Sequence, residues 1–109
     1  MNLYLVRHSI AENISIDIKD FDRALTDEGK FVISKASEEW SKYISDVEVI
    51  LTSPLKRALE TAEIISSNIK SPHNIIKDNN LGTGIKTAHL IDLLNSLDYK
   101  NVFVVGKPA

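Results

Sequence analysis

The sequence contains no cysteine, so disulfides cannot stabilise this chain. Their absence fits a reducing compartment, and we expect a cytoplasmic protein. With 43% hydrophobic residues in a length of 109, the chain can bury a core without disulfides or a metal ion. We therefore expect one domain spanning residues 1–109.

An excess of positive charge is also missing. The chain carries 13 Lys and Arg against 15 Asp and Glu, so no overall positive field favours nucleic acid or an anionic membrane. Long apolar runs are lacking too, because Arg7 and His8 interrupt the run at Leu3–Val6 long before it could span a membrane. We expect a soluble protein with no nucleic-acid or membrane partner, in which any anion site is local.

Three short apolar runs are present instead, at Leu3–Val6, Val47–Leu51 and Asn101–Val105. Their nearly continuous apolar composition is typical of parallel strands covered on both faces, so each run predicts a short buried strand. The polar stretch 71–83 is predicted to be a loop containing a brief strand at Asn74–Lys77.

Apolar residues at helical spacing predict three helices between these strands. Thr26 is the expected N-cap of the first helix. Ser53, directly before Pro54, is the expected N-cap of the second helix. The expected buried stripes are, in chain order, Val32, Ile33, Ala36, Trp40, Tyr43 and Ile44; then Leu55, Ala58, Leu59, Ala62, Ile65 and Ile69; then Leu90, Ile91, Leu94 and Leu97.

This order of elements predicts an α/β fold with a mostly parallel sheet and helices on both faces. The last predicted strand ends at Val105 and the sequence at Ala109, so no helix follows to cover that strand. We expect a domain that is truncated at its C-terminal end.

Ligands of open parallel sheets bind outside the carboxyl ends of the strands. The predicted strands deliver to that edge Arg7 with His8, then Ser53 with Arg57 one turn further on, and finally Lys107. Helix N-termini and guanidiniums both bind phosphate oxygens. Each residue alone has an ordinary interpretation as a solvated charge or a helix cap, and only their convergence predicts a phosphate pocket.

The two remaining histidines do not suggest a metal site. His73 and His89 fall in a predicted loop and a predicted helix, without the paired spacing of metal ligands. Both are expected to be structural or solvent-facing, and neither a metal ion nor another cofactor is expected.

The residues at the predicted edge also form motifs. Leu5–Ser9 resembles the Arg-His-Gly signature of the histidine phosphatase superfamily, also called phosphoglycerate-mutase-like, and of its short SixA-type branch in particular. Arg23–Gly29 resembles that branch's Arg-x-Leu-Thr-x-x-Gly element, and Leu51–Ala62 the family's Ser-Pro-x-x-Arg-Ala-x-x-Thr-Ala element. Val104–Lys107 falls where the family carries Val-x-Gly-His. These matches follow the family's order and cover nearly the whole chain.

The resemblance implies a phosphoglycerate-mutase-like three-layer sandwich and a hydrolase of phosphomonoesters or phosphoproteins. It makes His8 the nucleophile that accepts the phosphoryl group. For a phosphohistidine substrate a strong general acid is less necessary, because a protonated imidazole leaves readily. The site residues that the resemblance implies are His8, Arg7 and Arg57 as catalytic groups, and Arg23, Ser53 and Lys107 as substrate-binding groups.

Two positions depart from the family pattern. Ser9 replaces the glycine after the histidine, which adds a hydroxyl to the pocket or constrains the backbone. Lys107 replaces a second catalytic histidine, and a lysine supplies charge without the proton transfer of an imidazole. The family also continues with a helix and a strand beyond this point.

The sequence therefore predicts a phosphohistidine phosphatase that works through a phospho-His8 intermediate on a phosphorylated protein, such as a phosphorelay domain. Two alternatives remain open. One is a catalytically impaired phosphate-binding remnant of the family, and the other is a phosphomonoesterase that acts on a small phosphorylated metabolite.

Overall fold

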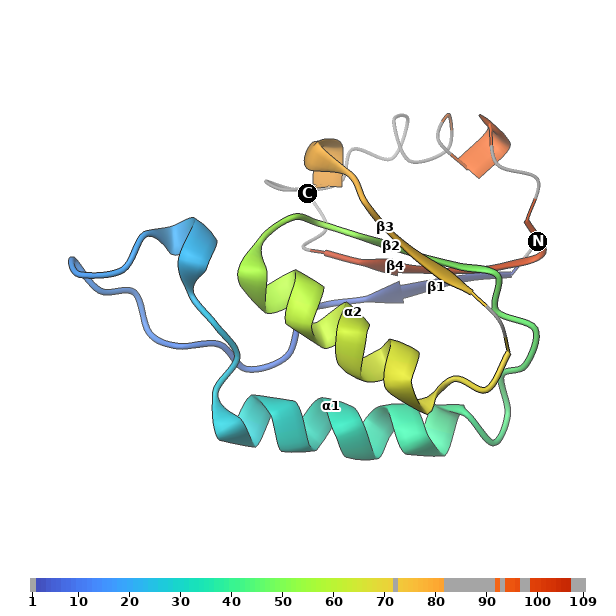
Figure 1. Ribbon diagram of the computed structural model, residues 1–109, viewed down its shortest axis with the longest axis horizontal. Helices are drawn as coiled ribbons and strands as arrows, with labels where there is room; N and C mark the ends of the chain where they lie inside the picture. The colour runs from blue at the N-terminus through green and yellow to red at the C-terminus, as the bar shows by residue number, and fades with distance from the viewer. Residues whose placement is uncertain (1, 72, 82–91, 93, 97–98, 107–109) are drawn as a thin grey trace.

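The described part of the structure, a computed structural model, comprises residues 2–71, 73–81, 92, 94–96 and 99–106. Its four strands form a parallel sheet in the order β1-β4-β2-β3. The helices α1 and α2 lie side by side below this sheet in Figure 1. The elements are β1 (Asn2–Val6), η1 (Asp20–Asp22), α1 (Asp27–Trp40), β2 (Val49–Thr52), α2 (Lys56–Asn68), β3 (Asn74–Lys77), η2 (Asn79–Leu81) and β4 (Asn101–Val105).

The sheet separates two apolar clusters, because successive strand residues point to opposite faces. Phe103 of β4 faces the helices, where its ring stacks on those of Tyr4 and Trp40 at centroid distances of 5.0 and 6.2 Å. The opposite face buries Val49, Leu51, Val102 and Val104 against Leu81 and Leu94. Leu94 belongs to a helical stretch at residues 94–96, so the predicted α/β sandwich with helices on both faces is confirmed.

The first strand is less buried than its apolar sequence predicts. Tyr4 and Val6 pack against the helix-side cluster, whereas Leu3 and Leu5 are 38% and 58% exposed. β1 lies at one edge of the sheet, and the cluster on the opposite face does not extend over it among the described residues. The expectation of a strand buried on both faces was therefore wrong for the alternate residues of β1.

The helices follow the predicted patterns with three corrections. Thr26 caps α1 as predicted, accepting a hydrogen bond of 2.9 Å from the Gly29 N–H, but α1 ends at Trp40. Val32 and Tyr43, both expected in the buried stripe, are 46% and 79% exposed. Ser53 does not cap α2, which begins at Lys56 with Leu55 in the N-cap position and no side-chain cap.

Of the third predicted helix, Leu90, Ile91 and Leu97 lie outside the described residues, and Leu94 is buried as expected. Within the described residues, no helix is long and apolar enough to cross a membrane.

The start of α1 packs directly on the segment that follows β1. The Ile10 carbonyl oxygen accepts a hydrogen bond of 2.9 Å from the Thr26 N–H and lies against the Cα of Gly29. A Cβ at residue 29 would overlap that oxygen and come within 3.0 Å of the Ile10 carbonyl carbon. Glycine is therefore required here for close backbone approach.

We expect Gly29→Ala to lower the free energy of unfolding by about 1–3 kcal/mol, the usual cost of overpacking a fixed contact. Helix propensity alone predicts the opposite sign, a gain of roughly 0.5–1 kcal/mol. Urea denaturation measures the difference. Lys30→Ala, at the next and exposed position of α1, is the control and should change stability by less than about 0.5 kcal/mol. A Gly29→Ala variant as stable as the wild type would contradict the proposed contact.

Candidate active site

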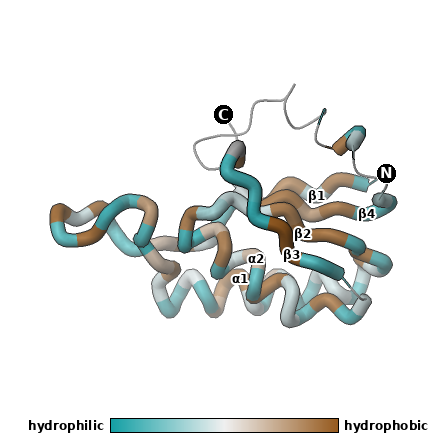
Figure 2. The backbone as a smooth tube through the Cα atoms, turned by 45° about the horizontal axis from the view of Figure 1, so that its top comes forward, coloured by the Kyte–Doolittle hydropathy of each residue, from teal (hydrophilic) through white to brown (hydrophobic). Residues whose placement is uncertain are grey.

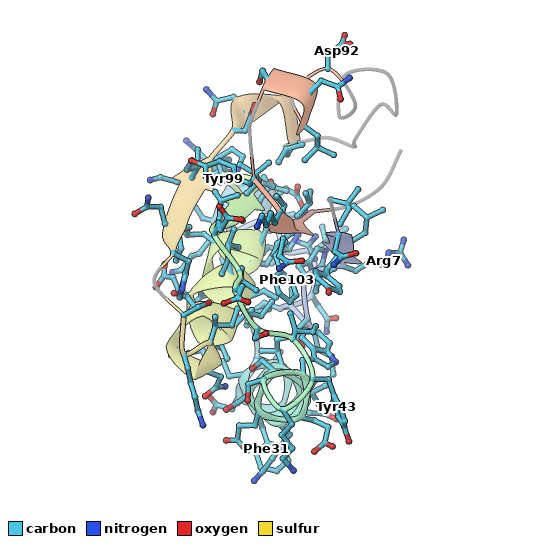
Figure 3. All side chains as sticks on the ribbon, turned by 90° about the vertical axis from the view of Figure 1, so that its right-hand side faces the viewer. Arg7, Phe31, Tyr43, Asp92, Tyr99 and Phe103 are labelled. Carbon is cyan, nitrogen blue, oxygen red and sulfur yellow. The ribbon has the colours of Figure 1, made fainter. Side chains whose placement is uncertain are left out.

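Four nitrogen-bearing side chains meet at the carboxyl edge of the sheet. Arg7 and His8 follow β1 directly, Arg57 is the second residue of α2, and Arg23 follows η1. Together they line a cavity of about 280 Å³. The fold thus brings together four of the six residues that the sequence singled out. Of these four, Arg7 is the most exposed, and its side chain extends outward in Figure 3.

The His8 ring lies between two partners that fix its tautomer. The Ser9 carbonyl oxygen, 2.8 Å from Nδ1, can only accept a hydrogen bond, and the Arg57 Nε–H, 3.3 Å from Nε2, can only donate one. The neutral ring therefore carries its proton on Nδ1 and its lone pair on Nε2. An imidazole lone pair beside a cavity lined by arginines has the chemistry needed to attack an anionic phosphoryl group.

The surroundings keep this imidazole neutral. Burial lowers the pKa of His8, the hydrogen bond to Ser9 raises it, and the positive charges of the arginines that line the cavity lower it again. The net result is a pKa below the usual 6.5. At neutral pH the neutral form of His8 therefore predominates.

Arg57 is charged yet almost completely buried, with 7% of its side chain exposed. A buried guanidinium is stable only when its N–H groups find acceptors. Besides contacting His8, Arg57 donates from Nη1 to the Asp20 carbonyl oxygen at 2.8 Å and from Nη2 to Asp20 Oδ2 at 3.3 Å. Residue 20 thus supplies both a backbone and a side-chain acceptor.

Asp20 also joins Arg57 to Arg23. Its Oδ1 lies 2.9 Å from both Nε and Nη2 of Arg23, whose Nη1 donates to the Glu12 carbonyl oxygen at 2.9 Å. Desolvation by itself would raise the pKa of Asp20, but Arg57 and Arg23 outweigh it and hold that pKa below its usual value. Asp20 is therefore ionised at neutral pH, when it cannot act as a general acid, and it occupies donors that suit a phosphate.

Behind the cavity, Ser9 ties the end of β1 to both helices. Its N–H donates to Thr61 Oγ1 at 3.1 Å, and its hydroxyl donates to the Gly29 carbonyl oxygen at 2.7 Å. Thr61 Oγ1 in turn donates to the Arg57 carbonyl oxygen at 2.7 Å. The Ser9 hydroxyl bonds to the first turn of α1, so the serine acts as a constraint on the backbone.

One residue of this arrangement, Asp20, was missed from the sequence, and Thr61 lay in the matched Thr-Ala element without an assigned role. The spacing of Asp20 and Arg23 is a recognisable signal for a local ion pair. The contact between Asp20 and Arg57 joins residues 37 positions apart, and no local pattern reveals it.

The remaining two predicted site residues are not brought to the cavity. Ser53 is buried, where its Oγ accepts from the Leu55 N–H at 3.2 Å and its N–H donates to the Val105 carbonyl oxygen at 2.9 Å. Ser53 is not among the residues that line the cavity. Lys107 lies outside the described residues. Their roles in substrate binding stay predictions.

We expect His8 to titrate below pH 6.5, because the folded environment disfavours its protonated form. The folded protein binds this proton less tightly than the unfolded chain does. The free energy of unfolding contributed by His8 is therefore lost as the pH falls from 6.5 through the lower pKa of the folded state. Nitrogen-detected NMR of the imidazole measures the pKa and should also show Nδ1 protonated in the neutral ring. A pKa at or above 6.5, or a proton on Nε2, would contradict the assignment.

We expect Asp20→Asn to bind orthophosphate about threefold to tenfold more tightly at low ionic strength, because the variant removes a competing carboxylate. The Asp20 backbone oxygen, which holds Arg57 Nη1, is retained. Isothermal titration calorimetry measures the affinity, and Asp17→Asn, an exposed carboxylate of the same loop, is the matched control. Weaker phosphate binding by a folded Asp20→Asn variant would mean that Asp20 positions the arginines for the anion.

The sequence matches the family model of the histidine phosphatase superfamily (branch 1) over residues 3–82. It is also similar to an uncharacterized protein of Picosynechococcus sp. (strain ATCC 27264 / PCC 7002 / PR-6), with 38% identity over 73 residues. That match covers 67% of this chain and 44% of the relative, so the similarity spans less than half of the relative's length.

Several solved structures share the fold. A protein assigned as the phosphohistidine phosphatase SixA of Agrobacterium tumefaciens superposes with a TM-score of 0.82 at 21% identity, over 96% of this chain and 68% of its own. The protein histidine phosphatase SixA complexed with tungstate gives a TM-score of 0.78 at 25% identity, over 98% of this chain and 69% of its own. A protein assigned as an alpha-ribazole-5'-P phosphatase of Escherichia coli gives a TM-score of 0.67 at 19% identity, over 98% of this chain and 74% of its own.

The family model spans the β1 end that carries Arg7 and His8, the loop that carries Arg23 and the helix that carries Arg57. These residues are the ones that line the cavity. This chain belongs to branch 1 of the histidine phosphatase superfamily.

Proposed function

We propose that this protein removes phosphate from phosphohistidine through a phosphorylated His8 intermediate. The observation that carries the proposal is the His8 Nε2 lone pair, fixed by Ser9 and Arg57 beside an arginine-lined cavity. Membership of the family supports phosphoryl transfer as the chemistry. The choice of phosphohistidine as substrate rests on the groups around His8.

The proposed reaction has two steps. His8 Nε2 attacks the phosphorus, a new N–P bond forms, and the N–P bond to the substrate imidazole breaks while that imidazole takes a proton from solvent. Water then attacks the phospho-His8 phosphorus, which releases inorganic phosphate and restores neutral His8. In both steps negative charge on the phosphoryl oxygens is stabilised by Arg7, Arg23 and Arg57, of which Asp20 holds Arg23 and Arg57 in place.

The absence of an acid among the described cavity residues favours an imidazole leaving group. Among the described residues, the groups that line the cavity are three arginines and His8, and the carboxylate beside them, Asp20, is held ionised by its arginine partners. An alkoxide leaving group needs a proton from a positioned acid, whereas imidazole accepts one from water near neutral pH. We therefore favour phosphohistidine over phosphate esters of small metabolites, and a phosphorylated protein in the cytoplasm as the substrate.

We expect the wild-type chain, given a phosphohistidine protein labelled with ³²P, to acquire label that acid removes and alkali does not. His8→Ala should acquire none, because the attacking nitrogen is lost. Rapid quenching followed by gel electrophoresis measures the label, and release of inorganic phosphate measures turnover.

His73→Ala is the matched control, because His73 bonds to Ser66 and Ser71 and is not among the residues that line the cavity. It should be labelled like the wild type. Label that persists in His8→Ala, or a wild type that is never labelled, would disprove the intermediate. Faster turnover of a phosphosugar or phosphoserine than of phosphohistidine would favour the small-metabolite alternative.

A further inference from the structure

A loop of residues 11–22, which we call the projecting loop, extends from the body of the protein at the left of Figure 1. A bridge between Ala11 and Leu25 closes its base, and an antiparallel bridge between Ser15 and Ile18 closes its tip. At the tip the Asp17 N–H also donates to Ser15 Oγ at 3.1 Å. The projecting loop is therefore hairpin-like, with a defined tip.

The projecting loop presents apolar side chains to solvent. Ile14 is 82% exposed, Ile16 is fully exposed, and Phe21 is 51% exposed. Hydrophobic and hydrophilic segments alternate along this loop in Figure 2. A single exposed apolar residue is ordinary, but three in one short, shaped loop form the kind of patch that proteins use for interactions.

The same loop is fixed to the cavity. Arg57 holds Asp20 through its backbone oxygen, and Arg23 bonds to the backbone oxygen of Glu12. Ile16 is four residues from Asp20, so its Cα lies within roughly 14 Å of a residue that contacts the arginines of the cavity. A protein interface of about 800 Å² per partner has a radius of roughly 16 Å, which is enough to cover both the cavity and the tip.

The chemistry of the projecting loop favours one class of partner. Small-molecule sites are concave, whereas Ile14 and Ile16 are almost wholly in solvent. Residues 11–22 carry one lysine against four acidic residues, Glu12, Asp17, Asp20 and Asp22. This acidic balance disfavours anionic membranes and nucleic acids, which recruit clustered basic residues.

We infer that the projecting loop docks a protein whose phosphorylated side chain enters the cavity. The partner surface around that side chain is apolar, to cover Ile14 and Ile16, and carries neutral or basic groups opposite the loop's carboxylates. This inference rests on the proposed function for its substrate class. It adds that recognition depends on a protein surface as well as on the phosphoryl group.

The test measures binding of a helical phosphotransfer domain phosphorylated on histidine, by calorimetry, to chains carrying His8→Ala so that no turnover occurs. Adding Ile14→Ser and Ile16→Ser should weaken binding of this domain by at least about tenfold, as for the central apolar residues of an interface. The affinity of the same chain for orthophosphate should stay unchanged, because neither isoleucine is among the residues that line the cavity.

Tyr43→Ser is the control, because Tyr43 is 79% exposed and points away from the sheet in Figure 3. It should leave binding of the domain unchanged. The inference is overturned if the domain does not bind, if the loop variant binds it as tightly as the parent, or if orthophosphate affinity falls equally. Binding that depends on the loop while the wild type forms no phospho-His8 would contradict the proposed function alone.

Discussion

The buried guanidinium of Arg57 is the constraint on which the site depends. With 7% of its side chain exposed, Arg57 must satisfy its N–H groups from protein atoms, because unpaired buried charge is strongly unfavourable. The acceptors it finds are His8 Nε2 and the backbone and carboxylate of Asp20. One side chain at the start of α2 therefore orients the His8 ring and holds Asp20 of the projecting loop.

The backbone next to His8 is held by hydrogen bonds to both helices. Ser9 bonds to Thr61 of α2 and to Gly29 of α1, so the chain leaving β1 is attached to both helices at the residue next to His8. The close approach of Ile10 and Gly29 adds a contact that tolerates no side chain. Small shifts in either helix would therefore displace His8, and positional precision is what phosphoryl transfer requires most from a protein.

The charges around His8 suit the nucleophilic attack that we propose. Burial of the ring, together with the positive charges of three arginines, lowers the pKa of His8 and favours the neutral imidazole, whose lone pair faces Arg57. The carboxylate of Asp20 partly neutralises the same arginines when no phosphate is bound. In the proposed reaction, a phosphate replaces this carboxylate on the arginines, so the cluster keeps a negative counter-charge with or without substrate.

The sequence was sufficient to predict the type and order of the main elements, because continuous apolar runs and helical stripes are local signals of strands and helices. It also determined the Thr26 cap and the motif residues Arg7, His8, Arg23 and Arg57. It was wrong about the start of α2 and the burial of Leu5, since both depend on what packs against them. Three features became evident in the fold alone: the His8 tautomer, the bonds between Asp20 and Arg57, and the bonds of Ser9 to both helices. Each of these joins segments that lie far apart in the sequence or depends on a contact that does, and no local pattern encodes such a contact.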